Sequence, residues 1–340
     1  MKPQPTITIK DIARKFKCSP STVSRALNDS PLISIDTRNT IQEYAQKMGY
    51  QRNSVSLSLL QKSTKNLGVI LPSISHYHEY SMVEGLQSVL QPLGYLLNIC
   101  VTNESYELER EYIERLLANR VDGIFISISQ ETYDEGHDKH LKQALSRGVP
   151  LLFMDRRLES MDADTVTIDD YQGAWLATEH LIKVGCRRIA HLRGPVGLTV
   201  SEQRFKGYQD CLLRYSLQLD SSFVCPTTFQ FESAIEPTQW LINRPNRPDG
   251  IFGVNDQVCF GALKVIREQG LSVPQDCAVV GFDNTPFSQY SFPSLSSVGR
   301  QSRHIGVEAA HRFLDQFEND IPTQNIVLPP ELIIRESTQR

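Results

Sequence analysis

The sequence predicts a two-part α/β protein, with a small helical domain at the N-terminus and a body of parallel sheets behind it. Three features of the 340-residue chain lead to this fold class. Residues 8–28 hold two short helix patterns separated by a tight turn, and residues 1–65 are basic while the remainder is acidic. From Leu67 onward, apolar strand patterns alternate with amphipathic helix patterns, which is typical of parallel sheets covered by helices on both faces.

The first helix pattern follows Thr8, a good N-cap, and carries Asp11 in its first turn. Its apolar residues recur at helical spacing at Ile9, Ile12, Ala13 and Phe16. Ser19 is expected to cap a second helix that starts with Pro20, where a missing N–H costs nothing. That helix turns Val23, Ala26 and Leu27 inward and leaves Ser21, Thr22, Ser24 and Arg25 outside.

A small, hydroxyl-bearing helix face that ends in one arginine suits close contact with DNA. The alternative is an ordinary pair of packed helices, but the caps, the turn and the polar face together favour a helix-turn-helix. A third helix is expected over residues 37–48, capped by Ser34 and ended by Gly49. The three helices should pack around Ile12, Phe16, Val23, Leu27, Ile41 and Tyr44.

Charge supports the same division, because residues 1–65 hold eleven Lys/Arg and four Asp/Glu. The rest of the chain holds 24 basic and 35 acidic residues. A basic head on an acidic body is expected of a nucleic-acid-binding module fused to a non-binding one. A solvated basic arm fits less well, since this head has periodic apolar positions. Seven cysteines without a CxxC pair predict free thiols, and the sequence shows no export signal or run of about 18 apolar residues, so we expect a soluble cytoplasmic protein.

The body is expected to form two sheets, because a single sheet of this size would be large. The predicted strands cover residues 67–71, 95–101, 123–128, 150–155, 188–192, 250–254 and 277–283. The predicted helices cover residues 80–92, 107–119, 138–147, 171–184, 202–214, 232–242, 256–269 and 302–317. The break between the two sheets is placed near residues 164–168.

Ligands of parallel sheets bind at the carboxyl ends of the strands, so polar residues there are the first candidates for a binding site. They are residues 76–79, Ser127, Ser129, Asp155, Arg156, Arg204, Asn255, Asp256, Asp283 and Asn284. Such donors and acceptors suit the hydroxyls of a small polar ligand, although Asp256 is better explained as a helix N-terminal residue. The sequence shows no catalytic motif and no metal-ligand spacing of histidines, and His191 is expected to be a core residue. We therefore expect no enzyme activity, no cofactor and no metal.

Several motifs together resemble the lactose-repressor/galactose-repressor (LacI/GalR) family of bacterial transcription regulators. They are CSPSTVSRALN (18–28), MGYQRN (48–53), SVSLSLLQKSTKNLGVILP (54–72), DGIFIS (122–127), DRRLE (155–159), EQRFKGY (202–208), GVNDQVCFGALKVIREQG (253–270) and VVGFDN (279–284). The resemblance implies a body similar to periplasmic sugar-binding proteins, with an effector bound between two sub-domains joined by three crossovers. It also implies a homodimer that binds a pseudo-palindromic operator.

The expected domains are a DNA-binding domain over 1–52, a hinge helix and linker over 53–66, and a body over 67–340. Within the body, one sub-domain is expected over about 67–164 and 298–327, and the other over about 165–297 and 328–340. The resemblance implies that DNA contacts or helix caps are made by Thr8, Pro20, Ser21, Thr22, Ser24, Arg25, Asn28 and Ser34, with Leu59 wedged into the minor groove. It implies effector binding by His78, Ser129, Asp155, Arg204, Asn255, Asp283 and Gln301.

Two positions depart from the family pattern. Arg52 stands where a proline usually precedes the hinge asparagine, and the chain ends at Arg340 without a heptad tail, so no tetramer is expected. The sequence thus predicts a transcriptional regulator, most simply a repressor, controlled by a sugar or sugar derivative. A transport-associated sugar-binding protein would lack the basic helical head, and an enzyme would need a convergent catalytic set. Whether the effector releases or enforces DNA binding stays open.

Overall fold

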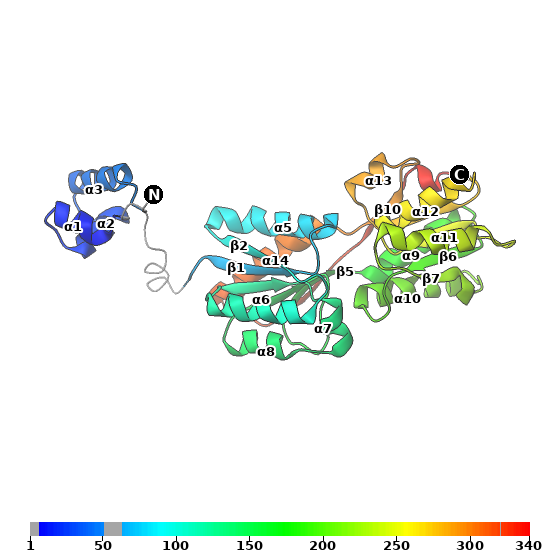
Figure 1. The fold of residues 1–340 in the computed structure, drawn as a ribbon, viewed down its shortest axis with the longest axis horizontal. Coiled ribbons are helices and arrows are strands. Elements are labelled where there is room, and N and C mark those ends of the chain that lie inside the picture. Colours follow the sequence, from blue (N-terminus) through cyan, green and yellow to red (C-terminus); the bar gives the residue numbers. More distant parts are fainter. Residues whose placement is uncertain (1–6, 51–62, 320) are drawn as a thin grey trace, which may run out of the picture. The chain divides into compact units, whose positions relative to one another are not determined.

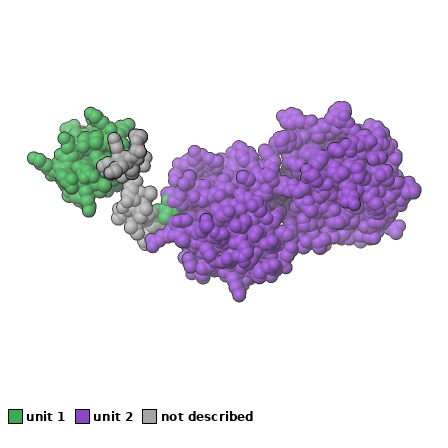
Figure 2. Space-filling model, viewed as in Figure 1, with its two compact units in different colours: residues 1–64 green, residues 65–340 purple. Residues whose placement is uncertain are grey.

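The computed structural model describes residues 7–50, 63–319 and 321–340. The chain divides into two units, residues 1–64 and residues 65–340, which Figure 2 shows in green and purple. The predictions for Arg52, for the hinge segment 53–60 and for Leu59 fall outside the described residues.

The first unit is a bundle of three helices, α1 (Ile9–Lys15), α2 (Pro20–Leu27) and α3 (Ile35–Lys47). Its core consists of Ile12, Ala13, Val23, Ala26, Leu27, Ile41 and Ala45. Phe16 and Tyr44 pack against this core. Their two rings meet edge to face, with centroids 5.3 Å apart. The predicted core is therefore confirmed.

Two of the three predicted caps in this unit are made by side chains. Thr8 and Asp11 form a reciprocal capping box, and the Ser19 hydroxyl accepts the Thr22 N–H at 3.1 Å. Ser34 occupies the N-cap position of α3, but its hydroxyl donates to the Thr37 hydroxyl at 2.8 Å instead of capping a backbone N–H. The third helix starts at Ile35, directly after the predicted cap residue.

The second unit contains two lobes, each a six-stranded sheet between two layers of helices (Figure 1). The first sheet has the order β11-β5-β4-β3-β1-β2, with every pair parallel. Its strands are β1 (Asn66–Leu71), β2 (Leu96–Val101), β3 (Gly123–Ile126), β4 (Leu151–Met154), β5 (Asp164–Ile168) and β11 (Asn325–Leu328). One face packs on α5 (Tyr77–Leu90) and α14 (Ser302–Asn319), and the other on α6 (Tyr106–Ala118) and α8 (Lys139–Ser146), with α7 (Gln130–Glu135) beside them.

Helices α5 and α14 approach each other through glycines. A Cβ at Gly85 would meet the Arg303 carbonyl oxygen at 2.1 Å, and a Cβ at Gly306 would meet the Met82 carbonyl oxygen at 2.0 Å. Any side chain at either position would separate the helices, so glycine is required for this packing.

The second sheet has the order β12-β10-β9-β8-β6-β7, and only the β10–β12 pair is antiparallel. Its strands are β6 (Ile189–Arg193), β7 (Val224–Pro226), β8 (Gly250–Gly253), β9 (Ala278–Asp283), β10 (Ser296–Gly299) and β12 (Glu331–Ile333). Helices α9 (Asp170–Lys183) and α10 (Thr199–Arg214) cover one face. Helices α11 (Ile235–Ile242) and α12 (Asp256–Glu268) cover the other, and the short α13 (Pro286–Tyr290) follows β9.

In the described part of the chain, three crossovers join the lobes: β5 to α9, β10 to α14, and β11 to β12. The predicted sub-domain limits need small corrections. Strand β5 pairs with β4 and β11, so the first crossover follows Ile168 and not Asp164. Strand β10 pairs with β9, so the second crossover follows Gly299 and not residue 297, and β11 ends at Leu328. Among the described residues, no helix has the length and apolar character needed to cross a membrane.

Candidate functional sites

The outer face of α2 is polar and accessible, as predicted. Val23, Ala26 and Leu27 point into the core. On the other side, Pro20, Ser21 and Arg25 are exposed, while Thr22 and Ser24 are half-buried. The Ser19 hydroxyl lies 2.7 Å from that of Ser21 and 2.9 Å from that of Thr22, which gathers hydroxyl groups at the start of the helix.

The remaining predicted residues of the head lie at helix ends. The Thr8 hydroxyl donates to Asp11 at 2.6 Å, and this bond, together with that from the Thr8 N–H, lowers the pKa of the Asp11 carboxyl. Asn28 is the C-cap of α2, and its N–H bonds to the carbonyls of Ser24 and Arg25. Ser34 is exposed at the start of α3. Thr8 and Asn28 thus have structural roles in addition to the DNA contacts that the resemblance implies.

A cavity of about 120 Å³ lies between the two lobes of the second unit. The first lobe contributes His76, His78, Glu104, Asp155 and Arg156. The second lobe contributes Val200, Arg204, Thr228, Phe229, Gln230, Asn255 and Asp283. Arg300, in the crossover between β10 and α14, also lines it. The structure therefore brings five of the seven predicted effector residues together: His78, Asp155, Arg204, Asn255 and Asp283.

Two aspartates face each other across this cavity from different lobes. Asp155 follows β4, Asp283 ends β9, and the Arg300 guanidinium pairs with both. The Arg300 Nη1 lies 3.4 Å from Asp283 Oδ1, and His78 Nε2 lies 3.8 Å from Asp155 Oδ2. Burial raises the pKa of Asp283 well above its usual value and lowers the pKa of His78 well below its own.

Arg204 and Asn255 are held in place by the second lobe. Arg204 is 1% exposed; it donates from Nε to Asp170 at 2.8 Å and from Nη1 to the Val254 carbonyl at 2.6 Å. Its guanidinium also lies over the Phe282 ring, 3.7 Å from the centroid. Asn255 caps α12 through the Val258 N–H and donates to the Phe229 carbonyl at 2.9 Å. The wall is therefore pre-organised, because its polar groups are already fixed.

The other two predicted effector residues do not line this cavity. Ser129 caps α7 through the Thr132 N–H, and its own N–H donates to the buried Glu109 at 2.7 Å. Gln301 lines a different cavity and donates to the Pro329 carbonyl at 3.0 Å. Its neighbour Arg300 lines the cavity between the lobes instead.

The sequence-based set also omitted several residues of the cavity wall. His76 and Arg156 were recognised as polar residues at strand ends, but Arg300 was missed because the short strand β10 was not predicted. Among the remaining omitted residues, Val200 lies in the first turn of α10. The others lie in loops, namely Glu104, Thr228, Phe229 and Gln230.

Asp256 has the structural role predicted for it. Its buried carboxylate accepts from the hydroxyls of Ser288 and Ser297, each at 2.5 Å, and from the Thr285 N–H at 2.8 Å. Burial raises its pKa to about 6. His191 is likewise a core residue, stacked on Phe252 with centroids 4.7 Å apart, and burial lowers its pKa to about 3. The described residues include no group of three or more His, Cys, Asp or Glu side chains that could hold a metal ion.

Comparison with known proteins identifies the family of this chain. Residues 8–53 match the family described as bacterial regulatory proteins, lacI family, and residues 178–338 match a periplasmic binding protein-like domain. The ribose operon repressor of Halalkalibacterium halodurans is 30% identical over 98% of this chain and 97% of its own length. The chain belongs to the lacI family.

Other similarities of this lacI-family protein also extend over almost the whole chain. The transcriptional repressor PurR of Vibrio atlanticus is 28% identical over 98% of each chain. The structure of the Lac repressor dimer bound to operator and an anti-inducer matches with a TM-score of 0.88, at 26% identity over 98% of this chain and 99% of that one. A complex of the regulator CelR with cellobiose matches with a TM-score of 0.74, at 25% identity over 97% and 99%.

The predicted fold class and family are therefore confirmed. The lacI-family protein is a DNA-binding transcriptional regulator and not an enzyme, since its relatives across the full length are regulators.

Glu79, in the first turn of α5, makes the stability of this regulator dependent on pH. Its side chain is almost fully buried, and burial raises the pKa of its carboxyl to about 8. Between about pH 5 and 8 the folded protein holds this proton while the unfolded chain releases it, so the free energy of unfolding falls as pH rises, by up to about 1.4 kcal/mol per pH unit. We expect Glu79→Gln to flatten this decline.

The measurement is urea unfolding of both proteins at several values between about pH 5 and 8. Glu84→Gln is the matched control, because Glu84 is exposed on the same helix. If the free energy of unfolding falls equally with pH in wild type and in Glu79→Gln, the prediction is contradicted.

Proposed function

We propose that this lacI-family regulator is a cytoplasmic repressor whose operator affinity is set by a sugar or sugar derivative bound between the lobes. The observation that most supports this proposal is the cavity between Asp155 of one lobe and Asp283 of the other, which Arg204 and Asn255 also line. Carboxylate, amide and guanidinium groups fix the orientation of hydroxyl-rich ligands. Phe229 is the single Phe, Tyr or Trp side chain among the described residues of the wall, which favours a sugar over a flat purine.

The names of relatives support a sugar as the effector. One is a ribose operon repressor, and one similar structure is a complex with cellobiose. The relatives named as transcriptional regulators support a site of action on cytoplasmic DNA.

On the DNA side, the exposed face of α2 carries the groups that we assign to the operator. Arg25 is assigned to a guanine edge, and Pro20 and Ser21 to bases at the start of the helix. Phosphate-positioning or helix-capping roles are assigned to Thr8, Thr22, Ser24, Asn28 and Ser34. Leu59 remains assigned to the minor groove from the family resemblance alone.

The coupling between the two sites is allosteric. An effector with different affinities for the open and closed cleft shifts the balance between two arrangements of the lobes. The lobes are joined at the crossovers after Ile168, Gly299 and Leu328. In a dimer, such a change alters the spacing of the paired heads, and with it their fit to two half-sites.

The test is selection of binding sites from random duplex DNA, followed by mobility-shift titration with and without a panel of sugars. We expect a pseudo-palindromic site, and a sugar that changes operator affinity. A selected site without two-fold symmetry would contradict the dimeric operator, and an operator affinity that no sugar alters would contradict the effector assignment.

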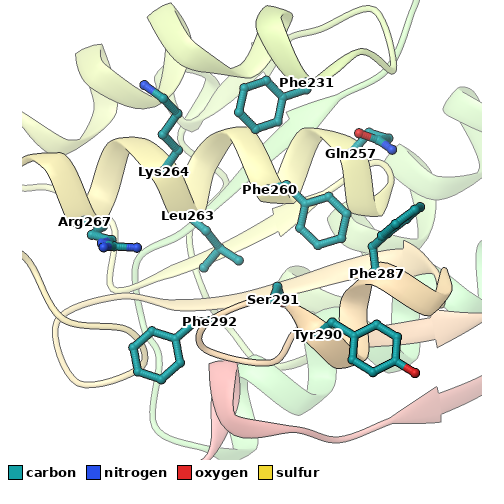
Figure 3. A pocket seen from close by; sticks show the side chains of 10 residues that line it. All are labelled: Phe231, Gln257, Phe260, Leu263, Lys264, Arg267, Phe287, Tyr290, Ser291 and Phe292. Carbon is teal, nitrogen blue, oxygen red and sulfur yellow. The ribbon is translucent and has the colours of Figure 1, made fainter.

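The homodimer of this proposal needs a self-complementary surface, and the second lobe has a candidate (Figure 3). Side chains of α12 and of α13 with its following loop line an open apolar groove. Phe287, Tyr290 and Phe292 are 63%, 76% and 85% exposed. Aromatic residues exposed to this degree are typical of interfaces, and a repressor with two-fold symmetry supplies a second copy as the occupant.

We expect Phe287→Asp with Tyr290→Asp to weaken dimerisation by at least about tenfold, because two charges would be buried against an apolar partner. Sedimentation velocity measures the monomer–dimer balance, and mobility shift measures operator affinity. Leu213→Asp, at an exposed apolar position of α10 outside the groove, is the matched control. A double variant that stays dimeric at wild-type concentrations would exclude this face.

A further inference from the structure

Arg300 occupies the centre of the cleft. It is 3% exposed and lines the cavity. Its Nη2 pairs with Asp155 of the first lobe, and its Nη1 lies 3.4 Å from Asp283 of the second. Its Nε has no hydrogen-bond partner in the described portion of the protein. A buried cation thus lies between Asp155 and Asp283, the two residues whose carboxyl groups we assign to effector binding.

The other two arginines of the cavity have carboxylate partners of their own. Arg156 donates to both oxygens of Glu104, at 3.0 and 2.8 Å. Arg204 donates to Asp170 at 2.8 Å, and neither Glu104 nor Asp170 is assigned to the ligand. Both guanidinium groups therefore keep a counter-ion when a ligand enters.

Arg300 differs because its counter-ions are the ligand-binding carboxylates themselves. Burial already lowers its pKa to about 10, so the cation is poorly solvated but still charged at neutral pH. Sugar hydroxyls that donate to Asp155 and Asp283 compete for the same oxygens. A neutral sugar would then leave a buried guanidinium with weakened partners, which is strongly unfavourable.

We propose that the effector is a monosaccharide acid whose hydroxyls bind Asp155 and Asp283 and whose carboxylate binds Arg300. This inference rests on the proposed function, because it assigns the chemical class of the same effector. The planar fork of a guanidinium matches a carboxylate, and the unpartnered Nε supplies a donor for it. A cavity of about 120 Å³ suits a small ligand such as a single sugar ring.

The experiment is calorimetric titration of the full-length protein with matched ligands: glucuronate against glucose, galacturonate against galactose, mannuronate against mannose, and glucose 6-phosphate as a phosphate arm. We expect at least one acid to bind roughly 10- to 100-fold more tightly than its neutral partner, the range for a hydrogen bond to a charged group. Arg300→Gln should weaken binding of that acid by a similar factor and remove the preference over the neutral sugar.

Two further variants keep the test interpretable. Arg300→Lys retains the charge between Asp155 and Asp283 but loses the fork, so it should retain part of the preference even if Arg300→Gln unfolds. Arg214→Gln removes a positive charge from an exposed position of α10 and should leave binding unchanged. Thermal unfolding of each variant reports whether it is folded.

Three results would overturn the proposal: equal or tighter binding of a neutral sugar, tighter binding of the sugar phosphate, or no binding by any acid of the panel. Unchanged binding of the acid by folded Arg300→Gln would also overturn it. If a neutral sugar binds and alters operator affinity, the proposed function stands and only the acid is excluded. If operator binding is intact but no carbohydrate alters it, the sugar effector itself is excluded.

Discussion

Arg25→Ala is expected to abolish operator binding while leaving effector binding intact. Arg25 lies in the last turn of α2 with its side chain exposed, and it is assigned to a guanine edge. A bidentate arginine–guanine contact contributes about 1–3 kcal/mol of discrimination. Because a dimer makes the contact in each half-site, the expected loss of operator affinity is roughly 10²- to 10⁴-fold.

The measurement is footprinting and mobility shift on the selected operator, with calorimetry on the body as a second readout. Arg25 is outside the core of Ile12, Val23 and Ile41, so the head should remain folded. Lys47→Ala, which removes one charge from the exposed end of α3, separates a general loss of positive charge from the loss of a base contact. A retained footprint for Arg25→Ala would exclude the helix face assigned here.

The head could be predicted closely from the sequence because its signals are local. Thr8 and Ser19 are capping residues placed three positions before the N–H groups they cap, and Pro20 marks the first turn of α2. At α3, Ser34 occupies the predicted N-cap position, but its hydroxyl bonds to the Thr37 side chain and not to a backbone N–H.

The body was predictable where strands are apolar and buried. Strands such as β8 and β9 are continuous apolar runs covered on both faces, and they lie within the predicted segments. Strands β5 and β10 contain mostly polar or small residues, DTVTI and SSVG, so nothing local identifies them. Because these two strands adjoin crossovers, their omission also displaced the predicted limits of the sub-domains.

The cleft shows the same limit. Asp155 and Asp283 end predicted strands and Asn255 follows one, and so the rule for strand ends located them. Ser129 also follows a strand, but its hydroxyl caps α7 and its N–H bonds to Glu109, and no local pattern reveals this competing use. Whether the Arg300 side chain reaches the cleft depends on the direction of the backbone in the crossover between β10 and α14. That direction is set by the tertiary fold and not by a local sequence pattern.

Asp283→Ala is expected to remove the response to effector while leaving operator binding in the absence of effector unchanged. Asp283 lines the cavity and belongs to the second unit, whereas the operator face belongs to the first. A hydrogen bond to a charged group contributes about 1.5–3 kcal/mol, so the loss of two such bonds should weaken effector affinity by at least about 100-fold.

Backbone geometry calls for a second variant at this position. Asp283 has a φ of 108°, in the left-handed region that alanine disfavours and asparagine tolerates better. Asp283→Asn therefore keeps the local conformation while it removes the carboxyl that pairs with Arg300. Asp315→Ala, at an exposed position of α14, is the matched control.

Mobility shift on the operator, titrated with the effector found in the panel, separates the possible outcomes. Loss of the response in both Asp283 variants, with unliganded operator affinity preserved, places the effector between the lobes. Loss in Asp283→Ala alone would attribute the effect to backbone conformation instead of the carboxyl group. If both variants respond at wild-type effector concentrations, the effector binds elsewhere and Asp283 serves only to hold Arg300.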